Sequence, residues 1–250
     1  MGRTTQLIIL ATALWGSALP CHAQSGFESK SALDQLKLAY EAMGEADYEG
    51  ALRYYTVAAE NAATRDLQFQ GYLGMGSAAS ALADPIAARA AYEKALEIKP
   101  GEPAALYSLA MVAKEEGAYE EAVSLFAEAA VRDPTFGAAL TQLGVVYSIL
   151  GRHEKSADAC WRAFSMSSDD LEALVCVAVA RYHLGLYAEA AQSFLAVLEK
   201  DPEHARARYG LGLCKIYRDD RDGAIQDYVK LKELDPDLAK DLYNRIFPDS

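Results

Sequence analysis

Residues 103–136 read PAALYSLAMVAKEEGAYEEAVSLFAEAAVRDPTF, and this stretch decides the fold. Its first half carries apolar residues at the spacing of one stripe along a helix: Leu106, Leu109, Ala110 and Ala113. Its second half carries a second stripe of the same kind: Ala122, Val123, Phe126, Ala129 and Ala130. The stretch therefore predicts two consecutive helices.

Two kinds of residue punctuate these helices and recur along the chain. Glycine ends the first helix because it tolerates the left-handed backbone that follows a helix C-terminus. Proline closes the second helix because it lacks the backbone N–H and clashes with the preceding turn. The glycines at 117, 151 and 185 and the prolines at 100, 134, 202 and 236 all keep to multiples of 34 residues. The skipped proline position carries the turn sequence Ser168-Asp169-Asp170. A fixed period of this length predicts a repeated supersecondary unit.

Small residues share the same period and mark where helices cross closely. They are Gly76, Ala110, Gly144, Ala178 and Gly212 in the first helices, and Ala88, Ala122, Ser156, Ala190 and Ala224 in the second helices. Without bulk at these points, two helix axes can approach to about 8 Å.

The combined pattern resembles the tetratricopeptide repeat, with its Leu-Gly, Tyr, Ala-x₃-Phe and Pro signature over 34 residues. Leu143-Gly144 and Tyr147 match the first part, and Ala122-x₃-Phe126 with Pro134 matches the second part. The resemblance implies an all-α, right-handed superhelical solenoid in one domain that binds protein or peptide partners. We expect the solenoid over 32–236, with units near 32–68, 69–102, 103–136, 137–170, 171–204 and 205–238, and a capping helix and tail at 237–250.

The N-terminus has the pattern of a secretory signal. Residues 1–23 contain Arg3 and then an apolar run over 7–19, which is shorter than the roughly 20 residues of a membrane-spanning helix. Cleavage is predicted between Ala23 and Gln24, followed by a short linker over 24–31, so we expect a periplasmic or secreted protein. An uncleaved anchor and a lipoprotein acylated at Cys21 are the alternatives.

The charge of the chain limits the classes of partner that it can bind. The formal net charge is −12, which disfavours nucleic acid as a partner. It also disfavours contact with a membrane, except for a lipidated form of the protein.

Cys160, Cys176 and Cys214 lie within apolar helical patterns, where cysteine usually behaves as a small hydrophobe. That interpretation is favoured, although a Cys160–Cys176 bridge is geometrically conceivable because both residues lie in neighbouring helices.

No pattern of catalytic or metal-binding residues stands out. His153, His183 and His204 fall in different elements without ligand spacing, and His153 is expected to face solvent. Nucleophile elbows and phosphate-binding loops are missing from the sequence. Acidic pairs such as Glu115-Glu116, Glu120-Glu121 and Asp219-Asp220 fall at predicted helix ends, where turns and the helix dipole explain them. We therefore expect neither an enzyme nor a cofactor.

In tetratricopeptide arrays the first helices line a concave surface, so their outward stripe predicts the binding residues. That stripe is apolar and aromatic: Tyr107, Met111, Val145, Val179, Tyr182, Tyr209, Leu213 and Tyr217. The paired Lys, Asn and Arg residues with which some family members hold a C-terminal carboxylate are absent from these positions. The favoured function is an exported scaffold that holds an apolar protein or peptide segment. The alternative is a membrane-held, pilotin-like assembly lipoprotein, and self-association is possible for either.

Overall fold

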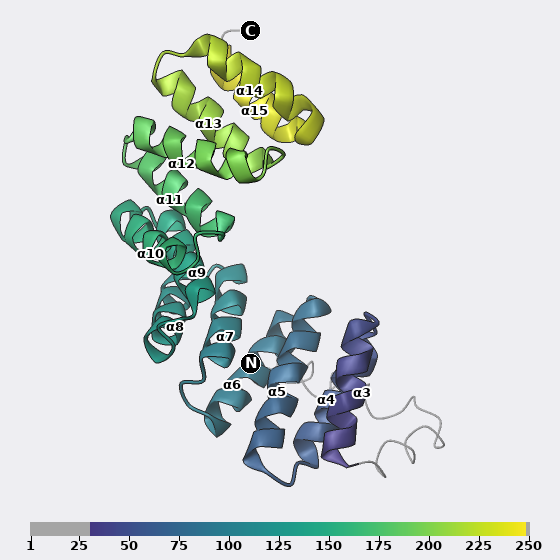
Figure 1. The fold of residues 1–250 in the computed structure, drawn as a ribbon. Coiled ribbons are helices and arrows are strands. Elements are labelled where there is room, and N and C mark those ends of the chain that lie inside the picture. Colours follow the sequence, from purple (N-terminus) through teal and green to yellow (C-terminus); the bar gives the residue numbers. More distant parts are fainter. Residues whose placement is uncertain (1–30, 249–250) are drawn as a thin grey trace, which may run out of the picture. The chain divides into compact units, whose positions relative to one another are not determined.

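The computed structural model describes residues 31–248, and all the regular secondary structure of that range is helical (Figure 1). Its helices are α3 (Ala32–Gly44), α4 (Tyr48–Glu60), α5 (Arg65–Ala81), α6 (Pro85–Ile98), α7 (Pro103–Glu115), α8 (Tyr119–Arg132), α9 (Gly137–Ile149), α10 (His153–Met166), α11 (Leu171–His183), α12 (Tyr187–Lys200), α13 (Ala205–Tyr217), α14 (Arg221–Leu234) and α15 (Pro236–Ile246). The all-α prediction is confirmed.

The chain divides after Pro100 into two compact units. The first unit holds two helix pairs, α3–α4 and α5–α6, and the second unit holds four pairs, α7–α8 to α13–α14, followed by α15. One continuous right-handed superhelix over 32–236 stays a prediction. Each unit is described by itself.

In the first unit, every helix begins at a side-chain cap. The capping oxygens belong to Ser31, Asp47, Thr64 and Asp84, and each accepts a hydrogen bond from a backbone N–H of the first turn. Such a bond satisfies a donor that the helix itself leaves unpaired. Helix α5 starts at Arg65, four residues before the predicted unit boundary at 69, and is a turn longer than the 13-residue first helices of the second unit.

The turn inside each pair has the backbone that the glycine period predicts. Gly117, Gly151 and Gly185 have φ angles of 78°, 70° and 76°, in the left-handed region. Ala46, Ala83 and Asp219 adopt the same region at the corresponding turns of the other pairs. The turn geometry is therefore common to all six pairs, whereas glycine occupies it in only three.

One proline both follows a helix and begins the next. Pro236 lies two residues after the end of α14 at Leu234, as the other periodic prolines do after α6, α8 and α12, and it is also the first residue of α15. Proline is tolerated in the first turn because the N–H that it lacks has no partner there in any helix. Asp235 caps the same helix by accepting from the Asp237 and Leu238 N–H groups.

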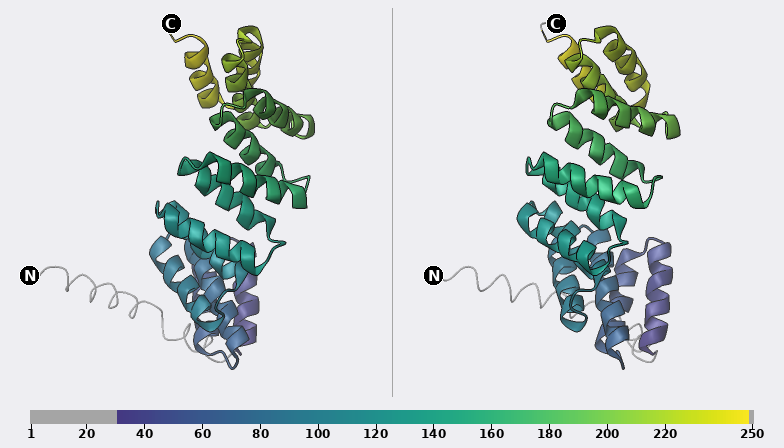
Figure 2. Two further views of the ribbon diagram at one scale, coloured as in Figure 1. Left: turned by 90° about the vertical axis from the view of Figure 1, so that its left-hand side faces the viewer. Right: turned by 60° about the vertical axis from the view of Figure 1, so that its left-hand side comes forward.

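In the second unit, the helix pairs stack in chain order (Figure 2). The second helix of each pair packs on the first helix of the next pair: α8 on α9, α10 on α11 and α12 on α13, and α14 packs on α15 in the same way. Helix α9 also contacts α11, α11 contacts α13, and α13 contacts α15. A groove between the second helices α8 and α10 has the α9 residues Leu140, Leu143 and Tyr147 in its lining.

A disulfide joins two neighbouring pairs. Cys160 of α10 and Cys176 of α11 are bonded through their sulfurs, with a Cα–Cα distance of 5.9 Å. The favoured prediction, three unbridged cysteines, is therefore wrong for these two, while Cys214 is free and buried. Gly144 makes the bridge possible, because a Cβ at that position would lie 2.0 Å from the Cys160 Sγ. The small residue needed for helix crossing also makes room for the two sulfurs.

No helix within 31–248 has the length and apolar character needed to cross a membrane. The predicted signal segment, its Ala23–Gln24 cleavage site and Cys21 lie outside the described residues.

Candidate interaction surface

The predicted surface residues lie on the first helices of the second unit, and three of the apolar ones are half-buried. These are Met111 on α7, Val145 on α9 and Val179 on α11. Val145 packs against the cluster of Cys160, Cys176 and Val177, and Val179 packs against the cluster that contains Leu174 and Phe194. Val145 and Val179 are accordingly continuations of the core.

Tyr107 is mainly a packing residue. Its ring contacts Phe126 at a centroid distance of 5.5 Å and Phe136 at 5.1 Å. Burial raises the pKa of its hydroxyl. An aromatic ring enclosed by two others stabilises the junction between α7 and α8.

Two predicted residues on α13 are covered by the C-terminal helix. Leu213 is only 8% exposed and packs in a cluster with Leu242 and Ile246 of α15, so little of its side chain is accessible to a ligand. The Tyr209 hydroxyl donates a hydrogen bond to Asp241 of α15, and burial raises the pKa of Tyr209 to about 12. Helix α15 thus occupies the part of the surface that these two side chains would otherwise offer.

Tyr182 and Tyr217 belong to an aromatic cluster that the sequence only partly indicated. Tyr187, at the start of α12, stacks on Tyr217 at the end of α13, with centroids 4.6 Å apart and an interplanar angle of 10°. Tyr182 packs edge-on against both rings, at 5.6 Å and 5.7 Å. Burial, followed by its hydrogen bond with Tyr217, raises the pKa of Tyr182. Tyr217 remains 56% exposed, so the cluster presents a large ring on a rigid base.

The same contact occurs one repeat earlier between two histidines. His153 at the start of α10 stacks on His183 at the end of α11, again at 4.6 Å and 10°. Burial, together with the charge of His153, lowers the pKa of His183. The expectation that His153 faces solvent is wrong, since it is half-buried with its Nδ1 enclosed. The sequence contained a signal for this contact. His153 and Tyr187 occupy the same position in consecutive repeats, and so do His183 and Tyr217, because each pair is 34 residues apart.

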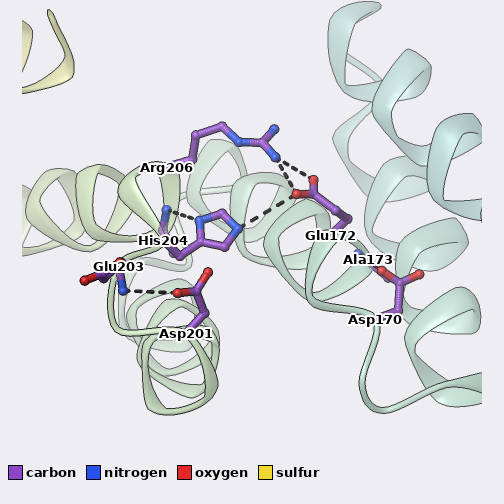
Figure 3. A network of polar contacts seen from close by, with 8 residues as sticks. Asp170, Glu172, Ala173, Asp201, Glu203, His204 and Arg206 are labelled. Atoms are coloured by element: carbon purple, nitrogen blue, oxygen red, sulfur yellow. Dashed lines mark hydrogen bonds and ion pairs between the residues drawn. The ribbon is translucent and has the colours of Figure 1, made fainter. Parts of the chain in front are cut away.

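The N-terminal ends of the same helices carry charged groups (Figure 3). Arg206 of α13 donates to both carboxylate oxygens of Glu172 on α11, at 2.5 Å and 2.7 Å. His204 caps α13 by accepting from the Ala207 N–H at 3.2 Å, and its Nε2 lies 3.8 Å from Glu172. Asp170 caps α11 in the same way through the Ala173 N–H at 2.9 Å. The surface is therefore polar at one end of α11 and α13 and aromatic at the other.

The described part of the chain holds no group of three or more His, Cys, Asp and Glu residues that could bind a metal ion.

The model of the tetratricopeptide repeat family matches residues 73–138 and 177–239, which together make up just over half of the chain. The chain belongs to the tetratricopeptide repeat family. Proteins of this family are in general non-catalytic scaffolds that bind protein or peptide partners, and the all-α solenoid fold expected from the resemblance is the one observed.

Solved structures of other tetratricopeptide proteins resemble this one. YrrB, a tetratricopeptide protein with an unusual peptide-binding site, is 28% identical, with a TM-score of 0.60, and the match covers 70% of this chain and 91% of YrrB. A tetratricopeptide repeat protein from Parabacteroides merdae ATCC 43184 has a TM-score of 0.74 at 16% identity, covering 86% of this chain and 85% of the other. MamA has a TM-score of 0.60 at 21% identity, with coverages of 70% and 94%. The last two likenesses show the fold alone. No protein with a curated description is significantly similar in sequence.

Proposed function

We propose that this tetratricopeptide protein is an exported scaffold that holds an apolar protein or peptide segment on the first-helix face of its second unit. The observation that carries the proposal is the cluster of Tyr182, Tyr187 and Tyr217, in which the most exposed ring is fixed by two others. A ring held in place loses little conformational entropy when a ligand packs on it. Aromatic residues of this kind are the usual anchors of an interface.

The half-buried side chains of Met111, Val145 and Val179 extend the apolar surface from this cluster along the first helices. Tyr107 and Tyr209 belong at its margin, since both are engaged in packing or in a hydrogen bond. The peptide-binding site of YrrB supports this choice, because that protein is the most similar in sequence of the solved structures compared above.

The binding test uses a matched pair of tyrosine variants. Peptides selected from a random-sequence display library against the chain are titrated by calorimetry into the wild-type, Tyr217→Ala and Tyr40→Ala proteins. Tyr40 is a suitable control because it is 58% exposed and makes one edge-on ring contact, with Tyr55, in the first unit. We expect Tyr217→Ala to weaken binding by about thirtyfold, equivalent to about 2 kcal/mol, with only a small fall in melting temperature from the lost ring contacts with Tyr182 and Tyr187. Equal losses in both variants, or no loss in Tyr217→Ala, would contradict the proposal.

Export rests on the leader sequence and is supported by the disulfide. Residues 1–23 have the arrangement of a secretory signal, with cleavage proposed between Ala23 and Gln24. Disulfides persist in oxidising compartments and are rare where thiols are kept reduced, so the Cys160–Cys176 bridge suits a periplasmic or secreted protein. The net charge of −12 disfavours nucleic acid and anionic membranes as partners, because both are negatively charged.

Mass spectrometry of the protein from its native host distinguishes the two exported forms. An N-terminus at Gln24 supports the secreted or periplasmic scaffold. A diacylglycerol-modified Cys21 supports the alternative, a membrane-held assembly lipoprotein. An intact N-terminus beginning at Met1 would contradict both.

A further inference from the structure

Helices α14 and α15 enclose a pocket of ≈ 270 Å³ that lies outside the surface proposed above. Its lining comes from one stripe of each helix: Tyr228 and Lys232 of α14, and Pro236, Ala239, Lys240 and Tyr243 of α15. Residues three, four and seven apart share one face of a helix, so these two stripes face each other across the pocket.

The pocket is open because α15 lacks the neighbour that earlier first helices have. Helices α9, α11 and α13 each pack against the second helix of their own pair, namely α10, α12 and α14. No helix follows α15 within the described residues, and the main contacts of α15 are with α14 and α13. The face of α15 that lines the pocket therefore has no covering helix in this part of the chain.

The walls of the pocket are aromatic and continue into a row of three rings. Tyr228 and Tyr243 have centroids 5.4 Å apart, and Tyr243 and Phe247 have centroids 4.8 Å apart. Tyr228 and Tyr243 are half-buried, so part of each of these two rings is left for an apolar group.

Both charged side chains of the pocket lining, Lys232 and Lys240, are cations. The Lys232 Nζ lies 5.9 Å from the centre of the Tyr228 ring, and the Arg221 guanidinium lies 4.7 Å from the centre of the Phe247 ring. Lys240 completes the set, and within residues 31–248 none of these three cations takes part in an ion pair. No carboxylate belongs to the pocket lining. The charged side chains of the lining are therefore positive, whereas the chain as a whole has a formal net charge of −12.

We propose that the pocket between α14 and α15 binds an acidic peptide segment of a partner protein, with an aromatic or large apolar side chain between its carboxylates. The apolar side chain packs on Tyr228 and Tyr243, and the carboxylates pair with Lys232 and Lys240. The aromatic walls favour such a peptide over a free inorganic anion, which has no apolar part. The overall negative charge favours it over an anionic bilayer, which would face a repelling surface on most of the molecule.

The probe is a fluorescein-labelled heptapeptide of sequence EDEFEDE, measured by fluorescence anisotropy against the full chain. Its amide counterpart QNQFQNQ tests the need for charge. The variant Lys232→Gln/Lys240→Gln removes both cations, and Lys94→Gln/Lys230→Gln removes the same charge from exposed lysines outside the lining. Circular dichroism melting of each variant shows that the fold is retained.

We expect saturable binding of EDEFEDE that weakens with added salt and at least tenfold weaker binding of QNQFQNQ. Exposed ion pairs are individually weak, so losing both lysines weakens binding about tenfold, and the control pair changes it less than twofold. Tyr217→Ala, which tests the first-helix surface, leaves EDEFEDE binding unchanged. The proposed pocket and the proposed first-helix surface are therefore tested independently of each other.

Several results would overturn the proposal. They are no saturable binding of EDEFEDE, equal binding of both peptides, or equal losses in the two double-lysine variants. Binding to phosphatidylglycerol vesicles in place of the peptide would assign the pocket to a membrane surface. A dimer in sedimentation velocity that Lys232→Gln/Lys240→Gln converts to a monomer would assign it to a second copy of the chain.

Discussion

His153, the first residue of α10, and His183, the last residue of α11, lie face to face with ring centroids 4.6 Å apart. Burial and the neighbouring imidazole both oppose protonation of His183, so its pKa lies below its ordinary value of 6.5. One helix pair is thus joined to the next by a contact that disfavours protonation of His183.

This contact predicts a loss of stability in mild acid. Between the folded and unfolded pKa values of His183, the unfolded chain binds more protons, so lowering the pH favours unfolding. The stabilisation is present above pH 6.5 and is lost as the pH falls through the lower, folded pKa. Urea midpoints measured from pH 7.5 to 5.5 should fall more steeply for the wild type than for His153→Gln/His183→Gln. Parallel curves would contradict this.

The Cys160–Cys176 bridge predicts one free thiol in the chain that starts at Gln24. Denatured without reductant, this chain should titrate a single thiol, which belongs to Cys214, and the Cys214→Ala variant should titrate none. Reduction should lower the free energy of unfolding by about 2–4 kcal/mol, because the bridge closes a short loop in the unfolded chain. Three thiols in the denatured, unreduced chain would show that the bridge is absent.

Gly144 predicts a steric effect in the same place. An added Cβ would lie 2.0 Å from the Cys160 Sγ and 3.1 Å from the Cys176 Sγ, so Gly144→Ala should destabilise the protein by about 1–3 kcal/mol. Gly137→Ala in the same helix is the control, since its Cβ would meet the nearest atom only at 3.9 Å. That control should stabilise the protein by about 0.4–1 kcal/mol. Urea denaturation measures both, and similar effects of the two changes would contradict the packing argument.

Asp227 of α14 is buried between two cations of α13. One of its oxygens lies 2.7 Å from the Lys215 Nζ, and the other lies 3.5 Å from the Arg208 Nη1. Asp227→Asn should lower the free energy of unfolding by about 3 kcal/mol, because two cations would lose their buried counter-charge. Thermal and urea unfolding should both show this loss.

A second variant separates the loss of charge from the loss of packing. The α9–α10 pair carries Leu140, Tyr147 and Ala159 at the corresponding positions. The variant Arg208→Leu/Lys215→Tyr/Asp227→Ala copies them and should equal or exceed the wild type in stability. A triple variant as unstable as Asp227→Asn would show that packing, not charge, explains the loss.

The turn at Ala83 predicts a stabilising substitution. Its φ of 56° lies in the left-handed region, which costs a residue with a side chain about 1 kcal/mol. Ala83→Gly should therefore raise the urea midpoint, whereas Ala87→Gly, inside α6, should lower it by a comparable amount. A lower midpoint for Ala83→Gly would show that the turn carries no strain.

The surface shows where prediction from the sequence succeeded and where it stopped. Tyr217 was placed on an outward stripe by helical spacing alone, and it is exposed. Leu213 lies on the same stripe by the same spacing, yet it is buried. The difference is due to α15, which packs on α13 and covers Leu213 but not Tyr217. Spacing identifies the face of a helix, whereas the neighbouring element decides whether that face is accessible.

The sequence by itself determined the helices, their turns and the points where they cross, because these depend on side-chain spacing and on backbone preferences within a few residues. Tertiary structure alone decided that His153 meets His183, that Cys160 bonds to Cys176 and that α15 covers Leu213. Each of these contacts joins residues of different helices, so it depends on how one helix packs against the next. Local spacing does not encode that packing.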